Sequence, residues 1–378
     1  MAFKDYFRNR RVLVTGDTGF KGSWLCQWLL DLGAEVHGLA LPPHTRPALY
    51  GLLGLEDQIH HVDVDIRDRE ALARAVHAVR PQVVFHLAAQ AIVRLSYDLP
   101  LETIETNVLG TANLLAALEG VGYPPEDPCA AVMITSDKCY ENRETFDAYR
   151  EDEPMGGHDI YSMSKGAAEL VIASWRRSFQ TRPDGTPAAV RIASCRAGNV
   201  IGGGDWAQDR IVVDAIKAIT EGIPIPVRNP LSVRPWQHVL EPLSGYLQVA
   251  MELGSASDRA AAVSSAWNFG PGNDSERTVG ALCDEIVRHW EGASWEQMPG
   301  AGARHEARFL KLAVDKARHH LGWLPVWDFE RTVRNTVSWY RQVHGADDPS
   351  RTAQETTRAQ IADYVDAARG RALPWSGA

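Results

Sequence analysis

Tyr161 and Lys165 stand four residues apart, and the apolar positions that follow them repeat with the spacing of a helix. That spacing places the phenol and the ammonium group on one face of the helix. There the ammonium can lower the pKa of the phenol and hydrogen-bond the ribose of a nicotinamide cofactor, so that a phenolate accepts a proton from a substrate hydroxyl. Taken singly, such a pair is usually a coincidence on a protein surface, so its meaning depends on its surroundings.

A second group of reactive side chains, Ser136, Asp137 and Lys138, follows directly after a short apolar run. At the end of a strand, a hydroxyl, a carboxyl and an amine in succession can take part in proton transfer. The alternative is a turn that carries a solvated ion pair, and without the Tyr-x-x-x-Lys helix that alternative would be favoured. Together, the two groups of residues predict a catalytic site.

Gly16, Gly19 and Gly22 form a Gly-x-x-Gly-x-x-Gly loop between an apolar strand and an amphipathic helix. Glycines let the backbone approach a pyrophosphate closely, and the amides at a helix N-terminus attract that anion. Because glycine also occurs at ordinary tight turns, the pattern gains its weight from the strand and helix around it. We predict a dinucleotide site that contains Gly16, Thr18, Gly19, Phe20, Gly22, Asp65, Ile66, Leu87, Ala88, Ala89, Tyr161 and Lys165.

The loop after the second predicted strand lacks the acid that usually binds the adenine ribose of NAD, about 20 residues after the glycines. Residues 41–46 read Leu-Pro-Pro-His-Thr-Arg instead. Arg46 could pair with the 2′-phosphate of NADP, or it could be a solvated arginine in a proline-rich loop. We therefore expect NAD as the cofactor and leave NADP open.

A βαβ rhythm in the first half of the chain positions these residues. After the first strand, Phe20, Trp24 and Trp28 share one stripe of an expected helix, which Gly33 ends. Asp68 is the expected N-cap of a later helix. The alternation predicts an α/β fold with a Rossmann-type, doubly wound parallel sheet, whose strands lie at 11–15, 35–40, 59–64, 83–87, 130–135 and 188–196.

The regular alternation ends near residue 200, where glycines and prolines break the chain into shorter elements. We expect a dinucleotide-binding Rossmann domain at 1–198 with a return segment at about 236–268. A smaller C-terminal domain at 199–235 and 269–340 would bind the substrate. Residues 341–378 are polar and rich in alanine and arginine, and we expect a C-terminal tail that is helical or loosely docked.

The overall composition limits the classes of function. The chain has 378 residues and a net charge of -9, and an acidic protein is not expected to bind nucleic acid or anionic membranes broadly. No apolar run approaches the roughly 20 residues needed to cross a bilayer, and the N-terminus has no signal-peptide pattern. The 5 cysteines are dispersed and form no Cys-x-x-Cys pair, so we expect a cytoplasmic protein without disulfides or a metal.

A set of motifs resembles the extended short-chain dehydrogenase/reductase family, in its NAD-dependent epimerase/dehydratase branch, from about residue 10 to 340. Ser136-Asp137-Lys138 narrows the resemblance, because most nucleotide-sugar enzymes of the wider family carry Thr-Asp-Glu there. Asp17 departs from the pattern, since the family prefers histidine at that position. The matching motifs are TGDTGFKGSWL (15–25), FHLAAQAIVRLSY (85–97), TSDKCYENRE (135–144), YSMSKGAAEL (161–170), RAGNVIGGGDWAQDR (196–210), RPWQHVLEPLSGY (234–246), WNFGP (267–271) and HEARFLKL (305–312).

The resemblance implies 4,6-dehydration of a nucleotide sugar, with CDP-glucose as the substrate closest to these motifs and CDP-4-keto-6-deoxyglucose as the product. One tightly held NAD would take a hydride from C4 and return it to C6 after water leaves across C5 and C6. In this scheme Ser136 hydrogen-bonds the C4 oxygen and Tyr161 takes its proton. Asp137 protonates the departing C6 hydroxyl, and Lys138 is the C5 base or its electrostatic partner.

Cations and amides in the second region are expected to hold the diphosphate of the substrate, because arginine meets phosphate oxygens bidentately. Gln90 and Arg94, after the fourth strand, either touch the sugar or organise the loop. His305 and Glu306 match a family motif but could be ordinary loop residues. The expected substrate-binding residues are Gln90, Arg94, Asn199, Arg210, Arg234 and His305.

Two other functions stay open at this point. A nucleotide-sugar 4-epimerase on the same fold needs Ser136, Tyr161 and Lys165 but no acid and base for elimination, so Asp137 and Lys138 argue against it. A catalytically silent, cofactor-sensing scaffold belongs to a different class, because a fold alone does not fix a function. The intact catalytic residues argue against that scaffold.

The resemblance also implies an oligomer of identical subunits. In relatives, the helices that follow Pro100 and Tyr161 commonly pair between subunits. We therefore expect a homodimer, or a homotetramer built from such dimers.

Overall fold

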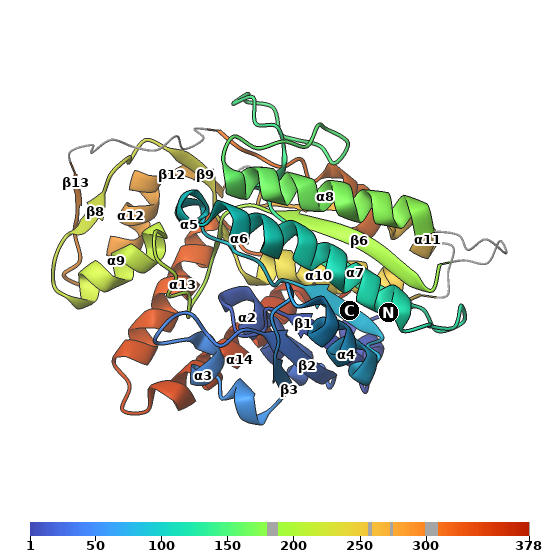
Figure 1. Ribbon diagram of the computed structural model, residues 1–378. Coiled ribbons are helices and arrows are strands. Elements are labelled where there is room, and N and C mark those ends of the chain that lie inside the picture. Colours follow the sequence, from blue (N-terminus) through green and yellow to red (C-terminus); the bar gives the residue numbers. More distant parts are fainter. Residues whose placement is uncertain (180–187, 256–258, 273–274, 299–308, 378) are drawn as a thin grey trace.

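A seven-stranded parallel sheet lies at the centre of the protein (Figure 1). The computed structural model describes residues 1–179, 188–255, 259–272, 275–298 and 309–377. The strand order, β11-β6-β5-β4-β1-β2-β3, is that of a doubly wound Rossmann sheet. The strands are β1 (Arg11–Thr15), β2 (Glu35–Ala40), β3 (His60–Asp63), β4 (Val83–His86), β5 (Cys129–Ile134), β6 (Val190–Ala197) and β11 (Ala266–Phe269).

The predicted fold class is confirmed, and the predicted strand segments match β1 to β6 to within about two residues at each end. The seventh strand, β11, was not predicted as a strand. It pairs with β6 in parallel and is buried along its whole length. A four-residue run buried on both faces has no polar alternation, so its pattern cannot be told from that of a buried helix segment.

Helices cover both faces of the sheet, and successive strand residues point to opposite faces. Val12 and Val14 of β1 belong to a core shared with α2 and α10, whereas Leu13 belongs to a second core shared with α4 and α7. Figure 1 shows α7 and α8 side by side, and their residues are in contact. These helices are α2 (Phe20–Asp31), α4 (Arg69–Val79), α7 (Gly110–Gly120), α8 (Ile160–Phe179) and α10 (Leu240–Leu253).

The C-terminal segment is helical, and it packs into the core instead of docking loosely. Helix α14 (Pro349–Gly370) contacts α2, α3 (Leu49–Leu52) and α13 (Phe329–His344). Beyond it, Trp375 stacks on Phe3 from the N-terminus with ring centroids 4.9 Å apart. The buried carboxyl of Glu241 on α10 accepts a hydrogen bond from the Tyr364 hydroxyl at 2.7 Å. The two ends of the chain are therefore part of one core.

In Figure 1, the strand pairs β8–β13 and β9–β12 gather with α9 and α12 at one end of the molecule, where they form a smaller region. The strands pair as β8 with β13, β9 with β12, and β7 with β10. These elements are β7 (Val200–Ile201), α9 (Ile211–Thr220), β8 (Ile225–Val227), β9 (Val233–Pro235), β10 (Gln237–His238), β12 (Glu276–Thr278), α12 (Val279–Arg288) and β13 (Trp295–Gln297).

Two predicted helix signals act as expected. Oδ1 of Asp68 accepts hydrogen bonds from the amides of Glu70 and Ala71, which makes Asp68 the N-cap of α4. Gly33 has a φ of +81° just after α2, a conformation that favours glycine. The remaining elements are α1 (Phe3–Phe7), α3 (Leu49–Leu52), η1 (Leu55–Asp57), α5 (Val93–Asp98), α6 (Pro100–Ile104), η2 (Glu105–Leu109), η3 (Asp137–Cys139), α11 (Arg259–Val263), η5 (Ala317–Leu321) and α13 (Phe329–His344).

All five cysteines are buried and none forms a disulfide. Within the described ranges, no helix has both the length and the apolar character needed to span a membrane.

Candidate active site

The predicted cofactor and catalytic residues lie at the carboxyl ends of neighbouring strands. Strand β1 leads into the glycine loop, β4 leads to Leu87, β5 leads to Ser136 and β6 leads to Asn199. Strands β6, β5, β4 and β1 are consecutive in the sheet, so these loops meet at one edge although they are far apart in sequence. In doubly wound sheets, ligands bind at this edge.

The glycine loop is shaped by two glycines and leaves room at the third. Gly16 has a φ of +76°, and a Cβ atom there would lie 2.7 Å from the amide nitrogen of Ala88. A Cβ atom on Gly22 would lie 2.1 Å from the carbonyl oxygen of Gly16. At Gly19 the nearest protein atom would be 3.3 Å away, so the protein itself nearly accommodates a side chain there. Without a side chain at Gly19, the backbone can be approached closely by a pyrophosphate.

Helix α2 offers its N-terminus to the same space. It begins at Phe20 with Gly19 as its N-cap, and no side chain caps it. The first amides of a helix have no partner within the helix, and they attract an anion. The hydroxyl of Thr18 is occupied, because it donates to the carbonyl oxygen of Leu41 at 2.9 Å. The loop and the helix therefore fit a dinucleotide, with the backbone as the main ligand.

Asp17, which departs from the family pattern, is buried below β2. Its Oδ2 lies 2.7 Å from Nδ1 of His61 on β3, and Nε2 of the same ring lies 3.2 Å from Oδ1 of Asp63. A Cβ atom on Gly38 would lie 2.2 Å from Oδ2 of Asp17, so the glycine on β2 makes room for the carboxylate. The hydrogen bond that His61 donates to the Asp17 carboxylate raises the pKa of His61. A histidine is thus present beside this loop, but β3 supplies it.

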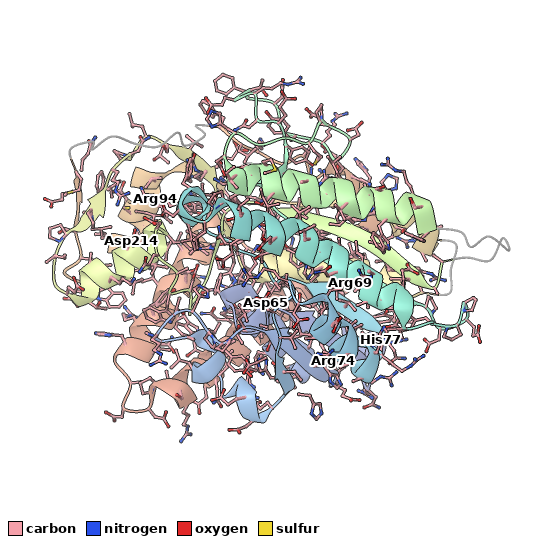
Figure 2. The ribbon with its side chains drawn as sticks, viewed as in Figure 1. Asp65, Arg69, Arg74, His77, Arg94 and Asp214 are labelled. Atoms are coloured by element: carbon pink, nitrogen blue, oxygen red, sulfur yellow. The ribbon has the colours of Figure 1, made fainter. Side chains whose placement is uncertain are left out.

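The predicted adenine-side residues are placed around α4 and α7. Asp65 accepts from the side chain of Arg67 at 2.6 Å, and this pairing lowers the pKa of Asp65. Figure 2 shows Asp65 beside the first turn of α4, which carries Arg69. Ile66 is buried, and its carbonyl oxygen accepts from the side-chain amide of Asn113. The backbone of Ile66 is therefore held by α7, and the Asp65 carboxylate pairs with Arg67 of its own loop.

The residues after β4 are tied to the end of β1. The amide of Leu87 donates to the carbonyl oxygen of Thr15 at 3.0 Å, and the amide of Ala88 donates to the hydroxyl of Thr15 at 3.2 Å. Ala89 follows, half-buried, in the same loop. These bonds hold the loop directly over the first glycine.

Ser136 and Asp137 form a hydrogen-bonded pair after β5. The Ser136 hydroxyl donates to Oδ1 of Asp137 at 3.0 Å and accepts from the amide of Lys138 at 3.2 Å. Both side chains are buried, whereas Lys138 is half-buried. Burial raises the pKa of Asp137, although the charge of Lys138 and the hydrogen bond with Ser136 oppose the rise. The carboxyl is therefore biased toward the neutral form that a proton donor needs.

Tyr161 and Lys165 lie one turn apart on α8, and both are buried. Burial raises the pKa of Tyr161 to about 12, and a hydrogen bond with Ser136 acts in the opposite direction. Burial also lowers the pKa of Lys165 to about 8, against the attraction of Glu169. Burial, and not the neighbouring ammonium, thus dominates the pKa of the phenol. The hydrogen bond nevertheless links Tyr161 to the Ser136–Asp137 pair.

A buried network that the sequence analysis missed fixes α8 against the sheet. Glu169, one turn beyond Lys165, pairs with Nη2 of Arg196 at 2.8 Å. It also accepts from the hydroxyls of Thr135 at 2.5 Å and Ser194 at 2.8 Å. These partners lie on β6 and at the end of β5, so the network sets the height of the Tyr-Lys turn above Ser136. A glutamate four residues after the lysine was the only sequence signal.

Gln90 and Arg94 have partners within the protein. The side chain of Gln90 donates to Oγ1 of Thr103 at 2.9 Å and accepts from the amide of Ile92 at 2.6 Å, so it organises the loop. Nη1 of Arg94 lies 2.9 Å from Oδ1 of Asp209, in the loop before α9. Figure 2 shows Arg94 next to α9, which carries Asp214. These contacts match the loop-organising alternative for both residues.

The other predicted substrate residues surround the smaller region. Asn199 is half-buried between β6 and β7, and its carbonyl oxygen accepts from the amide of Gln237. Arg210 is the N-cap residue of α9 and lies 3.4 Å from the carboxylate of Asp205. Arg234 lies on β9, opposite Arg277 of β12. His305 and its neighbour Glu306 lie outside the described residues.

The arrangement supports two kinds of chemistry at one place. The phenol of Tyr161 and the hydroxyl of Ser136 can take and hold the proton of a sugar hydroxyl while its carbon loses a hydride. The buried carboxyl of Asp137, which is hydrogen-bonded to Ser136, can protonate a leaving hydroxyl. In the described part of the chain, no group of three or more His, Cys, Asp or Glu side chains is arranged to hold a metal ion.

Comparisons with known proteins agree with this chemistry. The family model of GDP-mannose 4,6 dehydratase matches residues 13–336. The chain is 45% identical over 369 residues to a CDP-glucose 4,6-dehydratase of Salmonella typhimurium (strain LT2), covering 97% of this chain and 99% of that one. It is 29% identical to a dTDP-glucose 4,6-dehydratase of Neisseria meningitidis serogroup B, covering 88% of this chain and 93% of that one.

Solved structures share the fold. A dTDP-glucose 4,6-dehydratase from Streptomyces venezuelae with NAD and TYD bound matches with a TM-score of 0.71 and 24% identity, over 89% of this chain and 98% of that one. A UDP-glucose 4-epimerase of Thermus thermophilus in complex with NAD matches with a TM-score of 0.71 and 25% identity, over 88% of this chain and 99% of that one.

Proposed function

The chain belongs to the GDP-mannose 4,6-dehydratase family, and we propose that it is an NAD-dependent lyase that converts CDP-glucose to CDP-4-keto-6-deoxyglucose. The observation that carries this proposal is the buried Asp137 carboxyl, hydrogen-bonded to Ser136 at the end of β5. A redox site alone needs no such acid. The 45% identity to a CDP-glucose 4,6-dehydratase supports the choice of sugar nucleotide.

The cofactor of this reaction is NAD. It would be held by the backbone of the glycine loop, by the residues after β3 and β4, and by Tyr161 and Lys165, and when bound it supplies the acceptor and then the donor of one hydride. Arg46, the residue that left NADP open, is exposed in the loop after β2. The NAD named with the related dehydratase and epimerase structures supports NAD for this chain.

In the first half of the reaction, Ser136 and Tyr161 act on the C4 hydroxyl of the sugar. Ser136 donates a hydrogen bond to the C4 oxygen while Tyr161 takes its proton, and the C4 hydrogen leaves as a hydride. The Lys165 ammonium would stabilise the developing phenolate, and it would help to hold NAD by a hydrogen bond to the ribose. The product of this half is a ketone at C4, which acidifies the hydrogen on C5.

In the second half, water leaves across C5 and C6. Lys138 removes the C5 proton, or its charge stabilises the negative charge that develops at C5, while Asp137 gives its proton to the departing C6 hydroxyl. The hydrogen taken from C4 then returns to C6 as a hydride and C5 is protonated. In the net reaction the sugar loses one water molecule, and no external oxidant is consumed.

The rest of the chain is proposed to hold the nucleotide. Residues 1–198 and the return segment 236–268 would form the cofactor domain, and residues 199–235 and 269–340 would form the substrate domain. Asn199, Arg210 and Arg234 would bind the diphosphate, since arginine binds phosphate oxygens bidentately. His305 would belong to the same site.

Product analysis tests the proposal. Purified protein is incubated with CDP-, dTDP-, UDP- and GDP-glucose, and the sugars are identified by NMR. We expect a 4-keto-6-deoxy sugar, formed fastest from CDP-glucose and about 10²- to 10⁴-fold more slowly by the matched variant Asp137→Asn. A C4-inverted sugar with its C6 hydroxyl intact would mean that the protein is a 4-epimerase.

We also propose that the enzyme is a homodimer, or a homotetramer of such dimers. Leu101 and Leu109, on α6 and the π-helical turn η2, are 72% and 53% exposed, and Leu170 on the adjacent α8 is 59% exposed. Exposed leucines on neighbouring helices favour association. Light scattering should show that Leu109→Glu with Leu170→Glu yields monomers, while the control Leu231→Glu, at another exposed leucine, leaves the oligomer intact.

A further inference from the structure

Lys21 lies in the first turn of α2, where the glycine loop becomes a helix. Contacts with the loop after β7 hold this turn in place. Trp24 donates from Nε1 to the carbonyl oxygen of Gly203 at 2.9 Å, and a Cβ atom on Gly202 would lie 3.1 Å from Cζ of Phe20. The backbone of Lys21 is therefore fixed at the junction between the cofactor loop and the segment that leads to α9.

The half-buried side chain of Lys21 interacts with charged groups from several other elements. Asp137 follows β5, Lys165 lies on α8, and Arg210 begins α9. The carboxylate of Asp205, which also interacts with Lys21, lies 3.4 Å from Arg210. Because β1 and β5 end at the same edge of the sheet, the turn that carries Lys21 and the loop that carries Asp137 meet at that edge.

With Lys21 itself counted, three basic side chains interact here with two carboxyl groups, Asp137 and Asp205. Lys165 and Arg210 are both basic, and Lys138 adds a further positive charge beside Asp137. Burial, followed by the charge of Arg210, lowers the pKa of Lys21 to about 8. Holding these cations together in a poorly solvated place costs free energy, and a dianionic ligand would offset that cost.

We propose that Lys21 is a phosphate-binding residue and that, together with Arg210, it binds the diphosphate of the nucleotide sugar. This inference rests on the proposed function, because a nucleotide sugar is the substrate that brings a diphosphate into this region. The pyrophosphate of the dinucleotide has the same chemistry and is the alternative ligand for Lys21. Arg210 favours the substrate, since it begins α9 and lies outside the loops proposed to hold the cofactor.

Binding measurements on three variants test the proposal. Lys21→Met removes the charge at nearly the same length, and Lys21→Arg keeps the charge. Lys4→Met is the matched control. Lys4 is exposed on α1, and its substitution changes the net charge by the same amount as Lys21→Met. Calorimetry with CDP and with NAD separates the two anions, since CDP carries the diphosphate but is not turned over. Thermal unfolding verifies that each variant is folded.

We expect Lys21→Met to bind CDP about 10- to 100-fold more weakly, the effect of losing one charged hydrogen bond. NAD affinity should change by less than about threefold. Lys21→Arg should recover most of the affinity for CDP, and Lys4→Met should match the wild type. If Lys21→Met does not fold, Lys21→Gln gives the same comparison.

Unchanged CDP affinity in a folded Lys21→Met variant would overturn the proposal. An equal loss of NAD affinity would also overturn it, because the anion would then belong to the cofactor. Turnover of CDP-glucose by the wild type is measured alongside. If the wild type makes no 4-keto-6-deoxy sugar although its CDP binding depends on Lys21, the proposed function fails and the phosphate site stands.

Discussion

The hydroxyl of Ser136 donates its hydrogen bond to Oδ1 of Asp137, 3.0 Å away. A serine hydroxyl has one proton to donate, so in this arrangement it is not available to the C4 oxygen of a sugar. A protonated Asp137 reverses the bond, because its O–H can donate to Ser136 and release the serine proton toward the substrate. The neutral carboxyl that the second half-reaction needs therefore also prepares the first.

Asp137→Asn should separate the two half-reactions. The amide of asparagine can donate to Ser136 but cannot protonate the C6 oxygen, so oxidation at C4 should continue and elimination should slow by about 10²- to 10⁴-fold. Stopped-flow absorbance of the reduced cofactor, followed by product analysis, measures both steps. Normal formation of the 4-keto-6-deoxy sugar by this variant would remove Asp137 from the mechanism.

Lys138→Met tests the other side of the elimination. We expect the variant to oxidise C4, seen as a transient absorbance of the reduced cofactor. It should exchange the C5 hydrogen with solvent deuterium at least about a hundredfold more slowly than the wild type, the lower range of general-base effects. Undiminished exchange would leave Asp137, or a water held by it, as the base.

Gly19→Val tests the cofactor loop with a side chain that requires only a small shift of the protein itself. Gly19 has a φ of -82°, which any residue adopts, and the nearest protein atom to a Cβ would be 3.3 Å away. The side chain should instead block the pyrophosphate and weaken NAD binding at least about tenfold. Gly51→Val is the control, because nothing lies within 4 Å of a Cβ there. Wild-type NAD affinity in a folded Gly19→Val variant would show that the cofactor lies elsewhere.

His61→Gln should destabilise the protein in a pH-dependent way. The variant leaves the buried Asp17 carboxylate without its cationic partner, which costs about 3 kcal/mol. Because Asp17 raises the pKa of His61, the stabilisation is complete below the ordinary histidine pKa of about 6.5 and fades as pH rises through the higher folded-state value. Urea unfolding should therefore show a larger loss at pH 6 than at pH 9. An equal loss of unfolding free energy at both pH values would contradict the pairing of His61 with Asp17. A similar pH-dependent loss in His60→Gln, a variant of the exposed neighbour, would also contradict it.

The sequence predicts the parts of this molecule that depend on local patterns. Each of these patterns involves residues that are close in sequence. The structure contains the alternating strands and helices, the cap at Asp68 and the paired Tyr161 and Lys165 where they were expected. Strand β11 was missed because four buried residues carry no alternation.

Pairings between distant segments were out of reach. The contact of Asp17 with His61 joins residues 44 positions apart, and Glu169 meets Arg196 across 27. Lys21 is an ordinary helix residue by its spacing, and only the folded sheet edge brings it near Asp137 and Arg210. Gln90 and Arg94 were proposed as substrate ligands or loop residues, and their partners in the fold favour the loop.

The fate of the hydrogen at C4 distinguishes internal redox dehydration from epimerisation. CDP-glucose that carries deuterium at C4 is turned over by the wild-type enzyme, and the product is examined by NMR and mass spectrometry. Internal redox dehydration predicts that the deuterium moves within the same molecule to C6 of a 4-keto-6-deoxy sugar. A product that keeps deuterium at C4, with its configuration inverted and its C6 hydroxyl intact, would show that the enzyme is an epimerase and not a dehydratase.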